Sequence, residues 1–555
     1  AAAVWRPYRV LDSLCARCGS TVLLPMSCCM SASVGSHISL LASAAGNRIQ
    51  SQKFSAAANK SISRRGPAPR ASIAPPPAGG DATDGATATA PKRAKVSMVS
   101  LGCPKNTVDG EVMLGDLFAE GFDITDDHDD SDAIIINTCG FVEDAKNESV
   151  NAILAAAAMK ADSATSGKQK KVIVTGCLAQ RYAEDLAAEM PEVDVVMGFE
   201  EYKNLPASIG SMLGVATRPH EGAGSRGRVR VGTSSPPFRP EALRKRLTPN
   251  HYAYLRVAEG CDHKCTFCAI PGFRGKFRSK QWAPIVEEAK ALADTGAREL
   301  CLIAEDTNQW GMDLKASDGR GLAELLEALA DVDGIEWIRI LYAYPSYFSE
   351  PLIDAIADIP QVAKYIDIPL QHITNLSLLR MNRPPRQHTE DLLYKLRDRI
   401  PGLALRTTFI SGFPGETQAE HEDLMKFCKE FKFERLGAFA YSEEDGTPAA
   451  GYPDQVEMAV RELRRDQLIS QQQDISEDFA LSRVGSELDV VIDSFNPDFD
   501  AWVGRTILEA PDIDPIVFIS EPAAGSGLPA LATGQMRRCR VSGTSTFDLE
   551  ADPLN

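Results

Sequence analysis

Short apolar runs rich in β-branched residues alternate with helix-like stretches along most of this chain, starting near residue 95. In the first third the runs are Val96–Leu101, Ala133–Ile136 and Val172–Val174, and a plausible helix follows each, such as Glu111–Glu120 after the first. Runs that are apolar throughout are typical of strands buried on both faces of a parallel sheet. The repeated strand–helix order therefore predicts an α/β domain with right-handed crossovers over residues 93–215.

A second series of apolar runs follows a stretch rich in Pro, Gly and Arg, residues 216–248, which is typical of a linker. Strand and helix patterns alternate again over residues 249–483 and end on a trailing helix. Repeated units of this kind predict a partial (β/α) barrel, whose functional site would lie at the carboxyl ends of its strands. The expected strands are Tyr252–Val257, Glu299–Ala304, Ile335–Leu341, Lys364–Ile368, Leu403–Ser411 and Arg435–Tyr441.

The composition places the chain among globular proteins, since 44% of its 555 residues are hydrophobic. Its apolar runs all fall short of the roughly 18 residues of a membrane span, so no membrane association is expected. A formal net charge of −17 argues against a general nucleic-acid binder, which would normally present a basic face. One local basic groove remains compatible with that charge, so we expect RNA contact to be secondary at most.

The beginning of the chain differs from the rest. Residues 1–80 hold nine Lys or Arg and thirteen Ser but a single acid, Asp12. Leaders rich in Arg and Ser and poor in acids are typical of organellar transit peptides, although an ordinary disordered tail would have a similar composition. We expect residues 1–92 to be a transit peptide and disordered leader that directs the protein to the plastid (chloroplast) stroma, or alternatively to the mitochondrial matrix.

Thirteen cysteines, an odd number, in a chain without a clear secretory signal argue against a disulfide framework and for metal or redox ligands. Cys103, Cys139 and Cys177, named here the first cysteine set, stand at the ends of the first three expected strands. Because carboxyl ends of parallel strands share one edge, these thiols are expected to converge. Three thiolates would leave one iron of a 4Fe–4S cluster open; the alternative is that they are buried as small hydrophobic residues.

The strongest motif is the second cysteine set, Cys261, Cys265 and Cys268, which has the spacing CxxxCxxC, follows Gly260 and contains Phe267. Its three thiols again leave one iron of a 4Fe–4S cluster free, here for chelation by S-adenosylmethionine (SAM), which one-electron reduction would cleave. A structural zinc site would need a fourth protein ligand. The alternatives to a SAM-cleaving cluster are a zinc site and a chance occurrence of the cysteine spacing.

Polar or Gly-rich segments follow the expected barrel strands, at the end where a cofactor would bind. Gly412 and Gly415 would let the backbone approach a flat adenine or ribose. Each such signal is weak alone, since a Gly-x-x-Gly is most often a turn, but the signals recur at one end of successive strands. The residues that we expect to bind SAM are Phe267, Asp306, Gln371, Gly412, Gly415 and Glu416.

Several motifs resemble those of a known family. Ser100–Asp109, Asn137–Phe141 and Thr175-Gly176-Cys177 resemble the amino-terminal domain of methylthiotransferases. The CxxxCxxC region and Ile410–Thr417 resemble their radical SAM barrel, and residues 484–555 resemble their small β-barrel, the TRAM domain. The resemblance thus implies an α/β protein with a parallel-sheet domain, a partial radical SAM barrel and a carboxy-terminal β-barrel.

Within this family the chain is most similar to the RimO branch, which methylthiolates the β-carbon of an aspartate in ribosomal small-subunit protein twelve. Pro104-Lys105-Asn106, Cys139-Gly140-Phe141 and Tyr342–Ser346 carry that resemblance. It implies two 4Fe–4S clusters, an auxiliary one on the first cysteine set and a SAM-binding one on the second. It also implies that one SAM methylates a sulfur at the auxiliary cluster, while another yields the 5′-deoxyadenosyl radical with an electron donor such as ferredoxin or flavodoxin.

The charge of the tail supports this branch, because residues 484–555 hold twelve acids and four arginines, a net charge of −8. A module that grips RNA should be basic, whereas an acidic surface attracts a basic ribosomal protein. Alternatively, the acids only keep the surface soluble. Two other functions remain open at this point: a MiaB-like tRNA adenosine methylthiotransferase, and an RNA- or ribosome-binding protein whose cysteines hold structural metal.

Overall fold

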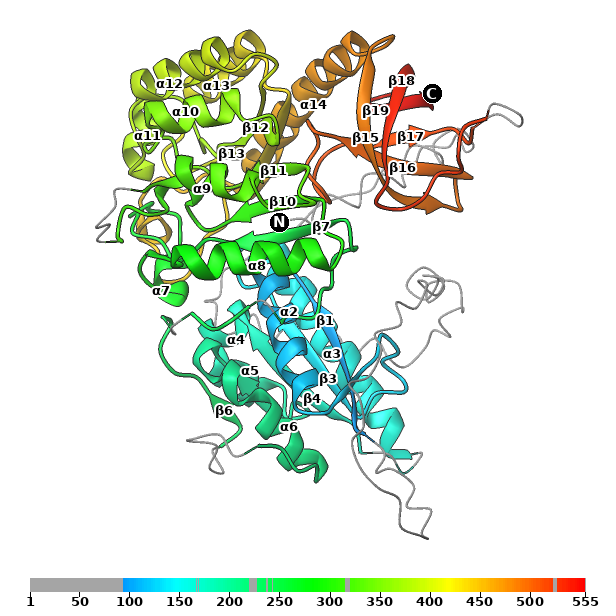
Figure 1. Ribbon diagram of the computed structural model, residues 1–555. Helices are drawn as coiled ribbons and strands as arrows, with labels where there is room; N and C mark the ends of the chain where they lie inside the picture. Colours follow the sequence, from blue (N-terminus) through cyan, green and yellow to red (C-terminus); the bar gives the residue numbers. More distant parts are fainter. Residues whose placement is uncertain are drawn as a thin grey trace, which may run out of the picture.

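The computed structural model contains three folded units that follow one another along the chain (Figure 1). The amino-terminal unit occupies one end of the molecule, and the other two units lie next to each other at the opposite end. The expected transit peptide, residues 1–92, lies outside the described residues. The structure describes residues 93–554 without 166, 168, 219–226, 236–237, 242, 315–319 and 523–526. Within these ranges, no helix has the length and apolar character needed to cross a membrane.

The amino-terminal unit is built on a six-stranded parallel sheet in the order β2-β1-β3-β4-β5-β6. Its centre consists of the three expected strands, β1 (Lys95–Ser100), β3 (Ala133–Thr138) and β4 (Lys171–Gly176). The outer strands are too short to carry a recognisable pattern and were not predicted. They are β2 (Asp123–Ile124), β5 (Val195–Met197) and β6 (Val229–Arg230).

Helices cover both faces of this sheet, as its two-sided apolar pattern predicts. Successive strand residues point to opposite faces, so Ile135 joins the core under α2 (Pro104–Ala119), whereas Ile134 joins the core under α3 (Glu143–Thr165). Helix α2 begins well before the expected Glu111, because its proline suits the first turn, where an amide N–H is not needed. The remaining helices of this unit are α4 (Cys177–Arg181), α5 (Ala183–Glu189), η4 (Phe199–Asn204) and α6 (Leu205–Leu213).

The middle unit is an open, wholly parallel sheet in the order β14-β13-β12-β11-β10-β7, which makes the expected partial barrel. Each expected strand is present, with ends that differ by a few residues from the pattern. The strands are β7 (Tyr252–Arg256), β10 (Glu299–Ile303), β11 (Trp337–Ile340), β12 (Val362–Asp367), β13 (Ala404–Ser411) and β14 (Arg435–Ala440). The longer helices are α8 (Trp282–Asp294), α9 (Leu322–Ala330), α10 (Glu350–Asp358), α12 (Arg386–Arg399), α13 (Gln418–Phe431) and the trailing α14 (Met458–Ser482).

The carboxy-terminal unit is a closed β-barrel in the order β15-β16-β17-β19-β18. The chain between its second and third strands leaves this barrel and packs into the partial barrel. There Ala510 is fully buried in one apolar cluster with Tyr254, Cys301 and Tyr365. The strands are β15 (Glu487–Asn496), β16 (Ala501–Thr506), β17 (Val517–Ile519), β18 (Met536–Ser545) and β19 (Asp548–Pro553).

A buried network of ion pairs, here called the domain clamp, joins the amino-terminal unit to the partial barrel. Arg256, the last residue of β7, lies 2.6 Å from Asp109 of α2 and 2.9 Å from Glu259. Arg256 also pairs with Glu241, which comes from the expected linker, residues 216–248. That segment is thus more than a linker, since part of it belongs to the domain interface. The clamp comprises Asp109, Glu111, Glu241, Arg244, Arg256, Glu259, Arg274, Lys280 and Glu288.

Candidate functional site

The thiols of the first cysteine set stand at one edge of the amino-terminal sheet. Cys103, Cys139 and Cys177 follow β1, β3 and β4, which are neighbours in the sheet. A Cβ placed on Gly102 would lie 2.8 Å from Cys139 Sγ, so the residue before Cys103 packs directly against the second thiol. Cys139 and Cys177 are buried, and Cys103 is half-buried. The structure thus brings the three cysteines to one edge, while their role as ligands stays a prediction.

Positive charge and an amide surround these thiols. Arg274 donates hydrogen bonds to Cys177 Sγ at 3.4 Å and to the Asn106 side-chain oxygen at 2.8 Å. Burial raises the pKa of the Cys177 thiol to about 12. Burial also acts to raise the pKa of the Cys103 thiol, but the charges of Lys105 and Arg274 outweigh it and lower that pKa. At Cys103 the cations therefore favour thiolate, the form of cysteine that binds metal.

The second cysteine set lies on the loop that follows β8 (Ala258–Glu259). Its three thiols are half-buried. Gly260 has a φ of +78°, and a Cβ there would collide with a neighbouring carbonyl group, so glycine is needed before the motif. The amide of Cys268 donates to the Cys265 carbonyl oxygen at 3.1 Å and closes a tight turn. Burial raises the pKa of the Cys261 thiol to about 12.

Side chains from the barrel hold this loop in place. His263, inside the motif, forms a 2.6 Å hydrogen bond with Asp306 and stacks on Tyr344 with ring centroids 3.6 Å apart. Arg383 lies over the same tyrosine ring and comes within 3.7 Å of Cys265 Sγ. Asp306 is fully buried, and its carboxylate is engaged by His263. Asp306 therefore orients the motif loop, and its contact with SAM stays a prediction.

The glycine-rich loop after β13 is shaped by contacts within the protein. Gly412 has a φ of +73°, and a Cβ there would collide with Arg461 of α14. Gly415 has a φ of +77° and also requires a residue without a Cβ. Glu416 is buried and accepts hydrogen bonds from the amides of Gly412 and Phe413, the latter at 3.1 Å. Packing and loop closure thus explain features that the sequence analysis attributed to the cofactor, and SAM binding here stays a prediction.

The two remaining residues expected to bind SAM lie near the ends of barrel strands. Phe267 packs against an apolar cluster that contains Phe413 and Tyr441. Gln371 has a φ of +72° and extends the sheet beyond β12, because its amide donates to the Thr408 carbonyl oxygen at 2.8 Å. Both side chains are half-buried. For both residues, SAM binding therefore stays a prediction.

Two charged residues to which the sequence analysis gave no role lie between the cysteine sets. Lys105 donates to the Ala304 carbonyl oxygen at 3.3 Å, just past β10, and its ammonium lies 3.5 Å from the Tyr342 ring centre. Glu305 follows Ala304, and burial raises the pKa of its carboxyl to about 7, although Lys105 counteracts this. A group that titrates near neutrality can take up or release a proton. The only sequence signal was the position of Lys105 beside Cys103, because its other neighbours are distant in the chain.

An arginine lies beside each cysteine set. In the described ranges, no three His, Cys, Asp or Glu side chains come close enough to hold one metal ion. Thiolates of a 4Fe–4S cluster bind different irons, so they are spaced more widely than the ligands of one zinc. Arg274 beside the first set and Arg383 beside the second offset the negative charge of thiolates.

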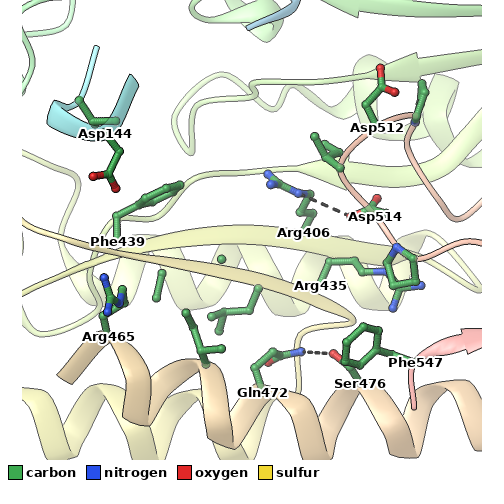
Figure 2. A pocket seen from close by; sticks show the side chains of 18 of the residues that line it. Asp144, Arg406, Arg435, Phe439, Arg465, Gln472, Ser476, Asp512, Asp514 and Phe547 are labelled. Carbon is green, nitrogen blue, oxygen red and sulfur yellow. Dashed lines mark hydrogen bonds and ion pairs between the residues drawn. The ribbon is translucent and has the colours of Figure 1, made fainter. Parts of the chain in front are cut away.

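A cleft of about 1640 Å³ opens beside β14, at the free edge of the partial barrel. Figure 2 shows residues of all three units lining it, including Asp144 of α3, Arg465 of α14 and Asp512 of the carboxy-terminal unit. Exposed acids predominate over exposed bases on its rim. The exposed acids are Glu143, Asp144, Glu443, Asp445, Glu462 and Asp512.

Two acids of the tail accept hydrogen bonds from tyrosines of the partial barrel, although one of them, Asp512, is also exposed at the cleft. Asp512 accepts hydrogen bonds from the hydroxyl groups of Tyr252 and Tyr254, at 2.9 and 3.2 Å. Asp514 accepts one from the Tyr365 hydroxyl at 2.7 Å. These contacts fix the carboxy-terminal unit on the partial barrel. The charge count over the tail thus overstates the acidic surface available to a partner.

Three family models match the chain, one for each unit. They are the Uncharacterized protein family UPF0004 over residues 95–198, the Radical SAM superfamily over residues 255–428 and the TRAM domain over residues 484–554.

Curated bacterial relatives named "Ribosomal protein uS12 methylthiotransferase RimO" are similar over most of the chain. The protein of Desulfitobacterium hafniense (strain Y51) is 41% identical over 458 residues, which cover 82% of this chain and 97% of that protein. The protein of Clostridioides difficile (strain 630) is 40% identical over 463 residues, covering 83% and 99%. The protein of Lachnoclostridium phytofermentans is 43% identical over 460 residues, covering 82% and 99%.

Proposed function

The chain belongs to the RimO family of radical SAM methylthiotransferases, and on that basis we propose that it adds a methylthio group to the β-carbon of an aspartate in ribosomal protein uS12. The observation that carries the proposal is the pair of cysteine sets on the two sides of one domain interface. Arg274 belongs to α7 (Ile270–Arg274), directly after the second set, yet donates to Cys177 of the first. Lys105, beside the first set, reaches the strand ends of the barrel.

Membership of the radical SAM superfamily implies a 4Fe–4S cluster and SAM, and we assign both to the second cysteine set. When bound, the cluster supplies the electron that cleaves SAM to the 5′-deoxyadenosyl radical. The protein keeps the loop in place through the hydrogen bond between His263 and Asp306, while Arg383 offsets thiolate charge at Cys265. We assign a second, auxiliary cluster to the first cysteine set, where Arg274 has the corresponding role.

The cleft beside β14 supports a basic protein as substrate. Its rim carries more exposed acids than bases, and opposite surface potentials speed the encounter of two proteins. Because all three units line the cleft, a substrate segment held there would contact each of them. RNA contact is secondary in this proposal.

The alternatives have less support. The MiaB-like tRNA methylthiotransferase is not favoured, because relatives that carry the uS12 name align with most of the chain at about 40% identity. An acidic rim would also repel phosphate. A binding protein with structural metal is disfavoured, because the chain matches the Radical SAM superfamily and relatives named as methylthiotransferases.

Mass spectrometry of uS12 tests the proposal. Anaerobically reconstituted protein, SAM, a reductant and uS12 should give a product that carries a methylthio group in place of one hydrogen of an aspartate. A tRNA substrate offered in parallel serves as the comparison. A methylthiolated adenosine together with unmodified uS12 would contradict the proposal and support the MiaB-like alternative.

Two further points complete the proposal. Ferredoxin or flavodoxin would deliver the electron, because SAM cleavage at a 4Fe–4S cluster requires a one-electron reductant. The protein would act in the plastid stroma, with the mitochondrial matrix as the alternative. The composition of residues 1–92 supports import into an organelle.

A further inference from the structure

Lys105 is a buried cation that forms no ion pair with any residue that the structure describes. Lys105 is only 7% exposed to solvent. Its ammonium donates one long hydrogen bond, to the Ala304 carbonyl oxygen at 3.3 Å. The centre of the Tyr342 ring lies 3.5 Å from the ammonium nitrogen, and the ring attracts the positive charge without neutralising it. No carboxylate in the described part of the chain forms an ion pair with Lys105. Because an ammonium has three donors, the protein leaves most of its hydrogen-bonding capacity for another group.

The other buried cations of the described residues show how unusual this is. Lys170 donates to the carbonyl oxygens of Asp129 at 3.2 Å and Ser131 at 2.8 Å. Ten other buried cations each form an ion pair with a carboxylate: Arg244, Arg256, Arg274, Lys280, Arg339, Arg435, Arg461, Arg464, Arg483 and Arg505. Burying an unpaired charge is costly. Cys103 and Glu305 lie near enough to raise the pKa of Lys105, but neither of them forms an ion pair or a hydrogen bond with its ammonium. The spare donors of this ammonium are therefore available to an anion that arrives from outside the chain.

The position of Lys105 identifies the kind of anion. The residue lies two positions after Cys103, in the first turn of α2, whereas Ala304 and Tyr342 follow β10 and β11 of the barrel. Its ammonium therefore lies between the first cysteine set and the strand ends where the barrel's cofactor site is expected. A carbon that reacts with groups from both sites has to come to this junction. In an aspartate the β-carbon is bonded directly to the carboxylate carbon, so the carboxylate arrives with it.

We propose that Lys105 binds the side-chain carboxylate of the substrate aspartate and thereby fixes the β-carbon between the two cysteine sets. This inference rests on the proposed function and adds the residue that selects aspartate. Tyr342 sets the position of the ammonium: its backbone has a φ of +62°, and its amide donates to Asp367 at 3.1 Å. A neutral asparagine in place of the aspartate would lose the charge-assisted hydrogen bond.

Peptide binding without turnover tests this. Two uS12 peptides, one with the target aspartate and one with asparagine in its place, are titrated into reconstituted enzyme with SAM but no reductant. Wild type should bind the aspartate peptide at least about tenfold more tightly, since hydrogen bonds to charged groups have about that effect. Lys105→Met should bind both peptides equally, and Lys105→Arg should keep part of the preference. Lys203→Met, an exposed lysine of the same unit, is the matched control and should behave as wild type.

Iron content and the absorbance spectrum of each variant separate a substrate role from a role at the cluster. Loss of the preference in Lys105→Met, with iron retained, supports the inference. A retained preference overturns it, and so does an equal weakening of both peptides with loss of iron. If wild type modifies uS12 but binds both peptides equally, the inference is wrong and the proposed function stands. If wild type neither binds nor modifies uS12, both are wrong.

Discussion

Replacing Arg256 by Met should loosen the joint between the amino-terminal unit and the partial barrel, because this arginine is the centre of the domain clamp. Arg256 is buried and contacts Asp109 at 2.6 Å, Glu259 at 2.9 Å, and Glu241. Methionine preserves much of the side-chain volume but leaves three buried carboxylates without one of their positive partners. The remaining cations of the clamp compensate only in part.

The expected cost is about 3 kcal/mol. Removing one partner from a buried ion pair typically costs about 3–5 kcal/mol, and the lower end applies because each carboxylate keeps a second cation. The pKa of Glu241 gives a similar magnitude. Although burial acts to raise it, Arg256 and Lys280 lower it from 4.5 to about 2, which corresponds to about 3 kcal/mol for this one carboxyl.

The pH dependence follows from the direction of that pKa. A carboxyl whose pKa is lowered in the folded state stabilises the protein above its ordinary pKa, 4.5, and this stabilisation is lost as the pH falls toward 2. The difference between wild type and Arg256→Met should therefore be full at neutral pH and shrink below about pH 4.5.

Native-state hydrogen exchange is the suitable measurement, since a chain of several units does not give one two-state free energy of unfolding. A loss of about 3 kcal/mol should lower the protection of amides in α2 and β7 by about 100-fold. Arg399→Met is the matched control, because Arg399 pairs with Glu350 at 2.9 Å on the surface of the barrel. Equal protection of α2 and β7 in the two variants would refute the clamp.

Further predictions concern the clusters, the tail and the leader. Alanine at all three cysteines of the second set should remove about half of the iron and all SAM cleavage, as iron analysis and 5′-deoxyadenosine assays would show. Alanine throughout the first set should instead spare that cleavage, and any methylthiolated product from it would disprove the auxiliary role. Asp498→Asn with Asp500→Asn should raise KM for uS12 at low salt and less at high salt, and an unchanged KM would mean that these exposed acids only aid solubility. Neutralising Asp512 and Asp514, by contrast, should lower thermal stability, because both accept hydrogen bonds from buried tyrosines. A fluorescent fusion of residues 1–92 should enter plastids, and cytosolic fluorescence would contradict the transit prediction.

The local pattern of the sequence was enough for the main strands and for the position of the cysteines. Runs such as Ala133–Ile136 are apolar on every residue and rich in β-branched side chains, which is typical of a strand covered on both faces. A cysteine at the end of such a run lies at the edge of the sheet whatever the rest of the fold does, so the sequence alone determined where the first cysteine set lies. It did not determine the short strands β2, β5 and β6, because they carry no pattern.

Only the tertiary structure assigned partners to the charged residues. Glu241 lies in a segment typical of a linker, yet it is buried in the domain clamp, where it pairs with Arg256. Glu416 accepts a hydrogen bond from the amide of Phe413 in its own loop. Lys105 forms no ion pair within the described ranges, whereas Asp512 accepts hydrogen bonds from two tyrosines. The physical reason is that strand formation depends on neighbours a few residues away. The role of a buried charge depends instead on groups that lie far along the chain, and folding alone brings these to within hydrogen-bonding distance.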